Sequence, residues 1–82
     1  HLTGNFEKAV SVYRQVIERQ PDYAPAYYNL ACAYARSGQV DAAKSAIRKA
    51  ISLDDTYRSK AVADRDLKPI RAWLESDSSQ NN

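Results

Sequence analysis

Hydrophobic residues in the first part of the chain recur every three or four positions. This spacing places them on one side of a helix, because an α-helix has 3.6 residues per turn. The pattern predicts an amphipathic helix from about Asn5 to Gln20, which Pro21 ends because proline cannot continue a helix. The apolar stripe of this helix consists of Phe6, Ala9, Val10, Tyr13, Val16 and Ile17.

Two further helices follow with the same periodicity. Pro25 fits the first turn of the second helix, where its missing N–H costs nothing, and Gly38 ends that helix. The third helix begins near Gln39 and has Asp41 in its first turn, where negative charge is favourable. The short loops predict antiparallel neighbours. The apolar faces carry Tyr27, Leu30, Ala31, Tyr34, Val40, Ala43, Ile47, Ala50 and Ile51.

After Tyr57 the pattern predicts a shorter helix to about Ala63, a tight turn, and a last helix from about Leu67 to Glu75. Residues 76–82 contain no apolar side chain, so we expect a disordered tail there. The side chains expected to lie against the third helix are Leu67, Ile70, Trp73 and Leu74.

The chain repeats itself at a spacing of 34 residues. Such a period indicates a helical solenoid, whose units bury their apolar faces against neighbouring units. It favours a surface that binds another protein over a site that does chemistry. The matched pairs are Gly4 and Gly38, Glu7 and Asp41, Ala9 and Ala43, Tyr13 and Ile47, Ile17 and Ile51, and Tyr23 and Tyr57.

One unit of the repeat runs Tyr27-x-x-Leu30-Ala31-x-x-Tyr34, then Ala43-x-x-x-Ile47, Ala50 and Asp55. It resembles the tetratricopeptide repeat, which has a Trp, a Leu-Gly pair and a Tyr on its first helix, then an Ala, a Phe and a closing Pro. Tyr27, Ala31 and Ile47 replace the family's Trp, Gly and Phe and keep their size class. Asp55 replaces the Pro, so this unit lacks the residue that normally ends the second helix of the repeat. The resemblance implies an all-α solenoid of antiparallel helix-turn-helix units.

The later stretch Asp64-x-Asp66-Leu67-x-Pro69-Ile70-Arg71 resembles the element that often closes such arrays. We therefore expect the C-terminal end of a longer array, divided into four parts. Residues 1–23 would be the second helix of a truncated repeat, 24–57 a complete repeat, 58–75 capping helices and 76–82 the tail.

The charge balance argues against nucleic acid or an anionic membrane as partner. The chain has twelve Lys and Arg residues and ten Asp and Glu residues, a net charge of +2. Positive and negative residues are interspersed along the chain. The longest apolar run, residues 30–35, is far shorter than the ~20 residues of a membrane span. We expect a soluble protein. The single cysteine, Cys32, favours a reducing compartment: cytoplasm, plastid stroma or bacterial cytosol.

Candidate catalytic and metal-binding residues are few. His1 is the only histidine and lies at the chain end, and Cys32 has no histidine near it in sequence. Asp54-Asp55 and Asp64-x-Asp66 fit helix caps better than a cation loop, which needs six or more converging oxygens. The two glycines stand too far apart for a phosphate loop. We expect no enzyme, no cofactor and no metal.

The resemblance implies a binding site on the first helix of the complete repeat. In the family this helix lines a concave groove, and the corresponding residues here share one helical face. We expect a partner peptide or helix to bind there, with added charge from Arg58 and Lys60 of the cap. The alternative is a structural end piece, of a longer array or of an enzyme fused to one, with no ligand of its own. The groove residues are Tyr28, Asn29, Cys32, Ala35 and Arg36.

The first helix should also leave part of its apolar stripe uncovered, because its own repeat is truncated. Apolar surface left open on a small domain tends to be buried by association. We therefore expect copies of this chain to self-associate through Phe6, Val10, Tyr13, Val16 and Ile17.

Overall fold

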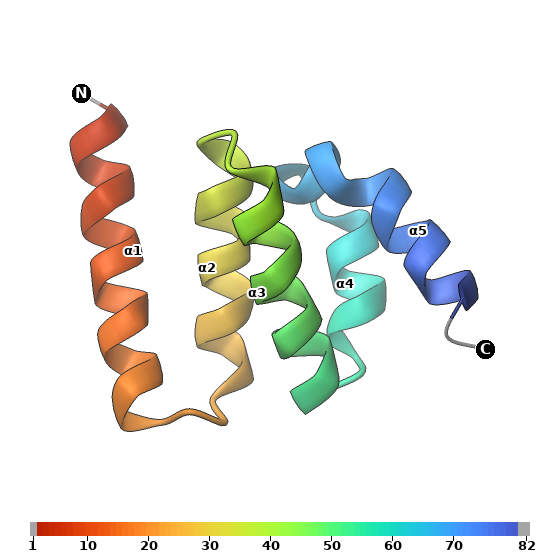
Figure 1. The fold of residues 1–82 in the computed structure, drawn as a ribbon, viewed down its shortest axis with the longest axis horizontal. Helices are drawn as coiled ribbons and strands as arrows, with labels where there is room; N and C mark the ends of the chain where they lie inside the picture. Colours follow the sequence, from red (N-terminus) through yellow and green to blue (C-terminus); the bar gives the residue numbers. More distant parts are fainter. Residues whose placement is uncertain (1, 81–82) are drawn as a thin grey trace.

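The structure, a computed structural model, describes residues 2–80, with side chains described for residues 5–76. It contains α1 (Leu2–Arg19), α2 (Ala24–Arg36), α3 (Val40–Leu53), α4 (Tyr57–Ala63) and α5 (Arg71–Gln80), and the 3-10 helix η1 (Arg65–Ile70) lies between α4 and α5. Residues 2–80 include no β-strand. The helices α1, α2 and α3 stand side by side and reverse direction at each short loop (Figure 1). The predicted all-α fold class is confirmed.

The turn between α2 and α3 depends on Gly38. Its φ of 86° lies in the left-handed region, which glycine adopts without steric cost. The N–H of Gln39 donates to the carbonyl of Tyr34 at 2.9 Å, and the N–H of Gly38 donates to that of Ala35 at 3.1 Å. These two bonds provide donors for carbonyls that would otherwise have no hydrogen bond at the end of α2. The turn brings α3 back alongside α2.

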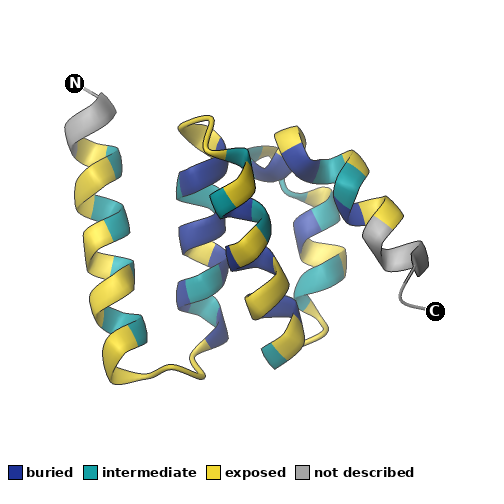
Figure 2. Cartoon of the chain, viewed as in Figure 1, coloured by how far each residue is buried: buried dark blue, intermediate teal, exposed yellow. Residues whose placement is uncertain are grey.

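The core is centred on α2, which packs against α1, α3 and η1. Alanines at its contacts, such as Ala31 and Ala43, have no exposed surface and allow the helix backbones to approach closely. Leu30 and Ile47 are buried, as predicted. In Figure 2 the buried residues lie on α2 and on the helices that follow it, whereas none of the described side chains of α1 is fully buried.

The C-terminal segment differs from its predicted boundaries. A 3-10 helix occupies residues 65–70, and α5 begins only at Arg71. Pro69 lies inside η1, and its missing N–H prevents the regular α-helical hydrogen bond at that point. The predicted packing against α3 holds for part of the segment only, since η1 contacts α2 more extensively than α3.

The helix α5 continues to Gln80, five residues into the stretch 76–82 that the sequence predicts to be disordered. Backbone hydrogen bonds of an exposed helix need no apolar side chains, so a polar composition does not by itself stop the helix. Residues 81 and 82 lie outside the described part of the chain, as does His1. Among the helices described, none combines the length and the apolar character that a membrane span requires.

Candidate functional site

The face of α2 on which the sequence places a binding groove is divided into two strips. Tyr28 and Ala35 are buried, with 5% and 4% of their surface exposed, and Cys32 is half-buried. Asn29 and Arg36 are exposed. One half of the predicted groove is therefore covered by the protein itself.

The cover comes from the C-terminal segment. The hydroxyl of Tyr28 donates a hydrogen bond to Oδ2 of Asp64 at 2.5 Å, and the ring of Tyr28 lies 5.1 Å from that of Tyr57 at 30°. The ammonium of Lys60 lies 5.2 Å from the Tyr28 ring centre and 5.6 Å from the Tyr57 ring centre. The N–H of Asp66 donates to Oδ1 of Asp64 at 2.9 Å, so Asp64 caps the start of η1. These contacts bind α4 and η1 to α2.

Burial and the hydrogen bond to Asp64 raise the pKa of Tyr28 above its ordinary range. Burial and the carboxylates of Asp64 and Asp66 raise the pKa of the Cys32 thiol to about 12, with Asp64 Oδ2 3.9 Å from the sulfur. The thiol therefore keeps its proton at neutral pH, whereas a reactive cysteine needs the thiolate. Cys32 does not have the surroundings of a nucleophile.

Ligand atoms of Cys32, Asp64 and Asp66 lie within 4.8 Å of one another. This is the spacing at which three side chains could share a metal ion. The oxygens of Asp64, however, already accept the Tyr28 hydroxyl, the Cys32 thiol and the Asp66 N–H. These hydrogen bonds hold the C-terminal segment on α2.

The structure places Tyr28 and Cys32 beneath the C-terminal segment and not in an open groove. The reason is steric: α4 and η1 occupy the space that a ligand of these two residues would need. Lys60 takes part in the same cover. Arg58 lies elsewhere, in a hollow beside α3. The structure does not bring Arg58 to the exposed residues of α2.

The other strip of α2 stays open. Asn29, Ala33 and Arg36 are spaced four and three residues apart, so they share one side of the helix. Next to the strip, α1, the last turn of α2 and the following loop enclose a hollow of about 530 Å³. Sequence reasoning missed the residues outside α2, because a pattern along one helix does not show what a neighbouring helix adds. The hollow is lined by Asn5, Phe6, Glu7, Ala9, Ala33, Arg36, Ser37 and Gln39.

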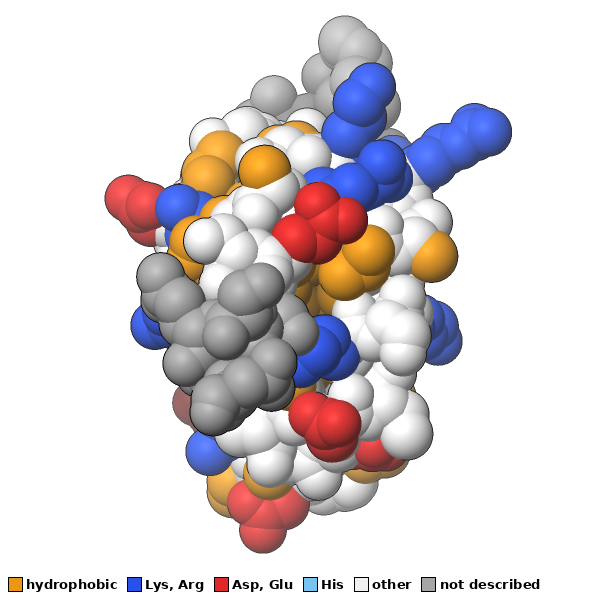
Figure 3. Space-filling view, turned by 90° about the vertical axis from the view of Figure 1, so that its right-hand side faces the viewer, with side chains coloured by type: hydrophobic (Ala, Val, Ile, Leu, Met, Phe, Trp, Pro, Cys, Tyr) orange, Lys and Arg blue, Asp and Glu red, His pale blue; other side chains and the backbone are white. Residues whose placement is uncertain are grey.

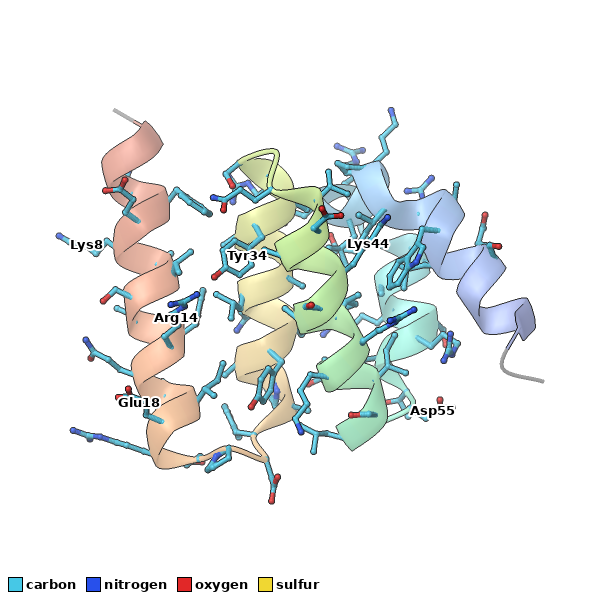
Figure 4. All side chains as sticks on the ribbon, viewed as in Figure 1. Lys8, Arg14, Glu18, Tyr34, Lys44 and Asp55 are labelled. Atoms are coloured by element: carbon cyan, nitrogen blue, oxygen red, sulfur yellow. The ribbon has the colours of Figure 1, made fainter. Side chains whose placement is uncertain are left out.

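The stripe of α1 that the sequence predicts to be uncovered is half-covered by α2. The rings of Phe6 and Tyr34 meet edge to face at 6.1 Å, and Nη2 of Arg14 donates to the Tyr34 hydroxyl at 3.0 Å. Figure 4 shows Arg14 directed toward Tyr34, with Lys8 pointing away from α2. The stripe residues that pack partly buried against the core are Phe6, Val10, Tyr13 and Ile17. Val16 has intermediate exposure.

Comparison with known proteins assigns the fold to a family. The family model described as the tetratricopeptide repeat matches residues 2–63, which is more than half of the chain. The chain belongs to the tetratricopeptide-repeat family. As such it is a protein-interaction module in the general sense.

Two plant proteins resemble part of this tetratricopeptide-repeat chain. Both are named probable UDP-N-acetylglucosamine–peptide N-acetylglucosaminyltransferase SPINDLY, one from Oryza sativa subsp. japonica and one from Hordeum vulgare. Each is 41% identical over 49 residues, which is 60% of this chain and 5% of the relative. The matched stretch is thus a small part of each relative. No solved structure gives a significant match.

Proposed function

We propose that this chain binds an extended segment of a partner protein along the open strip of α2. The observation that carries the proposal is the division of the α2 face. The protein covers Tyr28 with its own C-terminal segment but leaves Asn29 and Arg36 exposed, and Arg36 borders a hollow of about 530 Å³. Such a strip can bind the extended backbone of a peptide, and the hollow beside it can accept one of the peptide's side chains.

The side chains around this strip suit a peptide. The guanidinium of Arg36 can bind a carboxylate through two parallel N–H bonds, and the amide of Asn29 can pair with a backbone peptide group. Phe6, Ala9 and Ala33 give the hollow an apolar part where a ligand side chain can be buried. Specificity would then come from Arg36 and affinity from the apolar contact.

The proposed function includes no catalytic step. It is supported by the environment of Cys32, whose raised pKa keeps the thiol protonated. The chain has no second cysteine with which Cys32 could form an internal disulfide, which is consistent with the expected reducing compartment.

Charge reversal at Arg36 tests the proposal. Affinity capture and mass spectrometry would identify a partner, and its binding segment would be synthesised as a peptide. We expect Arg36→Glu to weaken this peptide by more than about tenfold and to leave the thermal midpoint nearly unchanged, because an exposed charge contributes little to folding. Lys8→Glu is the matched control and should bind like the parent. Equal affinity of Arg36→Glu and the parent would contradict the proposal.

The alternative is that the chain acts as the end piece of a longer array. One observation favours it: the C-terminal segment covers part of α2. Under this alternative, Arg36→Glu would leave partner binding unchanged. Removal of residues 58–82 would expose Tyr28 and destabilise the repeat, so the urea midpoint should fall strongly.

We also propose that α1 mediates contacts between copies of this chain. Its stripe is only half-covered, and Val12 on the same helix is 50% exposed. Association would bury this surface, and each 100 Å² of apolar area is worth roughly 2.5 kcal/mol before association costs.

A further inference from the structure

A second hollow lies on the other side of the molecule, between α3, α4 and α5. Its volume is about 770 Å³. Basic side chains line it from two helices, Arg48 and Lys49 from α3 and Arg58 from α4, and Trp73 of α5 borders it. Figure 3 views the molecule from the side of α5 and shows basic and acidic side chains with hydrophobic surface between them.

Positive charge is concentrated in this hollow. The whole chain has a net charge of only +2, yet the hollow has three basic residues and one acidic residue, Asp55, in its lining. Asp55 does little to neutralise Arg58. Its side chain is 88% exposed, and its Oδ1 lies 3.9 Å from Nε of Arg58, which is beyond hydrogen-bonding distance.

Arg58 has an unsatisfied donor. Its Nη1 is buried and has no hydrogen-bond partner in the part of the chain that the structure describes. A buried donor without an acceptor is costly, and a guanidinium offers five N–H groups in a fixed fork. A small turn of the Arg58 side chain would be needed for an oxygen in the hollow to satisfy this atom, because almost none of its surface is accessible. The ligand implied by Arg58 is therefore an acceptor, and its basic neighbours select a negatively charged one.

Neighbouring cations are held in position by aromatic rings. The guanidinium carbon of Arg48 lies 5.2 Å from the centre of the Trp73 ring, and Nζ of Lys49 lies 5.9 Å from that of Tyr27. Contacts of this kind restrict long side chains before a ligand arrives, which lowers the entropy cost of binding. Ile51 and Leu74 supply apolar wall to the same hollow.

We propose that this hollow binds an acidic segment of a partner protein. Its carboxylates would reach Arg58 and Lys49, and an adjacent apolar side chain would pack on Trp73. A peptide fits better than a nucleic acid, which presents charge at regular intervals and needs a continuous basic track, whereas this charge is confined to one hollow with an apolar wall. The site is separate from the open strip of α2 and does not depend on it.

Trp73 provides the readout, because it is the only tryptophan of the chain. The probe is an end-blocked octapeptide of six glutamates and two leucines, and the matched peptide has glutamine at each glutamate position. We expect saturable change of Trp73 fluorescence with the glutamate peptide and binding at least about tenfold weaker for the glutamine peptide. Added sodium chloride should weaken the glutamate peptide further.

Variants locate the binding. Arg58→Gln and Lys49→Gln should each weaken the glutamate peptide at least about fivefold, while Lys8→Gln on the far side of α1 should leave affinity unchanged. Lys49 is exposed, so its variant tests the site even if Arg58→Gln fails to fold by circular dichroism. The proposal would be overturned by equal binding of the two peptides, by no binding at millimolar peptide, by equal losses in Lys8→Gln and Lys49→Gln, or by tighter binding of single-stranded DNA.

Discussion

The hydroxyl of Tyr28, on α2, donates a 2.5 Å hydrogen bond to the carboxylate of Asp64, which lies thirty-six residues later in the chain and caps η1. Because the carboxylate also accepts the N–H of Asp66, one side chain joins the C-terminal segment to the central helix. The C-terminal segment that this bond helps to hold decides which part of α2 stays exposed. It covers Tyr28 and leaves Asn29 and Arg36 open.

Loss of this hydrogen bond should loosen the C-terminal segment. Tyr28→Phe keeps the buried ring and removes only the hydroxyl, so we expect the free energy of unfolding to fall by about 1.5–3 kcal/mol, as for bonds to charged groups. Urea denaturation measures the loss. Tyr23→Phe is the matched control, because Tyr23 is 47% exposed, and it should leave stability unchanged. Equal stability of Tyr28→Phe and the parent would show that the bond contributes nothing.

Stability should decline at alkaline pH through Cys32. The pKa of this thiol is raised from its ordinary value of 9.0 to about 12 in the folded chain, chiefly by burial. Between these values the unfolded chain has lost the proton that the folded chain keeps, so the contribution is complete below pH 9 and is lost as pH rises toward 12. Cys32→Ala should show a shallower decline across this window in urea titrations. Parallel curves for the parent and the variant would contradict the assignment.

The contact between α2 and α3 should dominate folding stability. Ile47 has no exposed surface, and Ile47→Ala would leave a cavity that costs about 2–5 kcal/mol. This is a large share of the stability of a domain of 82 residues. Val12→Ala, at a position that is 50% exposed, should change stability by less than about 0.5 kcal/mol. Similar losses in the two variants, measured by thermal unfolding, would show that the core is not where the structure places it.

Self-association through α1 should depend on concentration. Sedimentation equilibrium from micromolar to millimolar protein should show the apparent mass rising above that of the monomer. Val16→Glu introduces a charge into the half-covered stripe and should keep the chain monomeric. A constant monomer mass for the parent would mean that the contacts of Phe6 and Val10 with the core already cover the stripe sufficiently.

Local signals in the sequence were sufficient for the first three helices and for the family. Pro21, Pro25 and Gly38 act on their own stretch of backbone, so their effect on helix ends can be predicted without knowing the neighbours. The spacing of 34 residues between matched positions likewise follows from how one unit must stack on the next. Leu30 and Ile47 were predicted to be buried for this reason, and both are.

The site depended on contacts between distant residues, which only the tertiary structure decided. Tyr28 and the exposed Arg36 both belong to the groove face that helical spacing predicts. Nothing in the sequence around Tyr28 shows that Asp64 packs against it. Arg58 was expected to face the groove, but the path of α4 places it against α3 on the other side. Periodicity shows which residues share a face of one helix. Which face is covered depends on where the later segment packs, and that is set by the sum of its contacts.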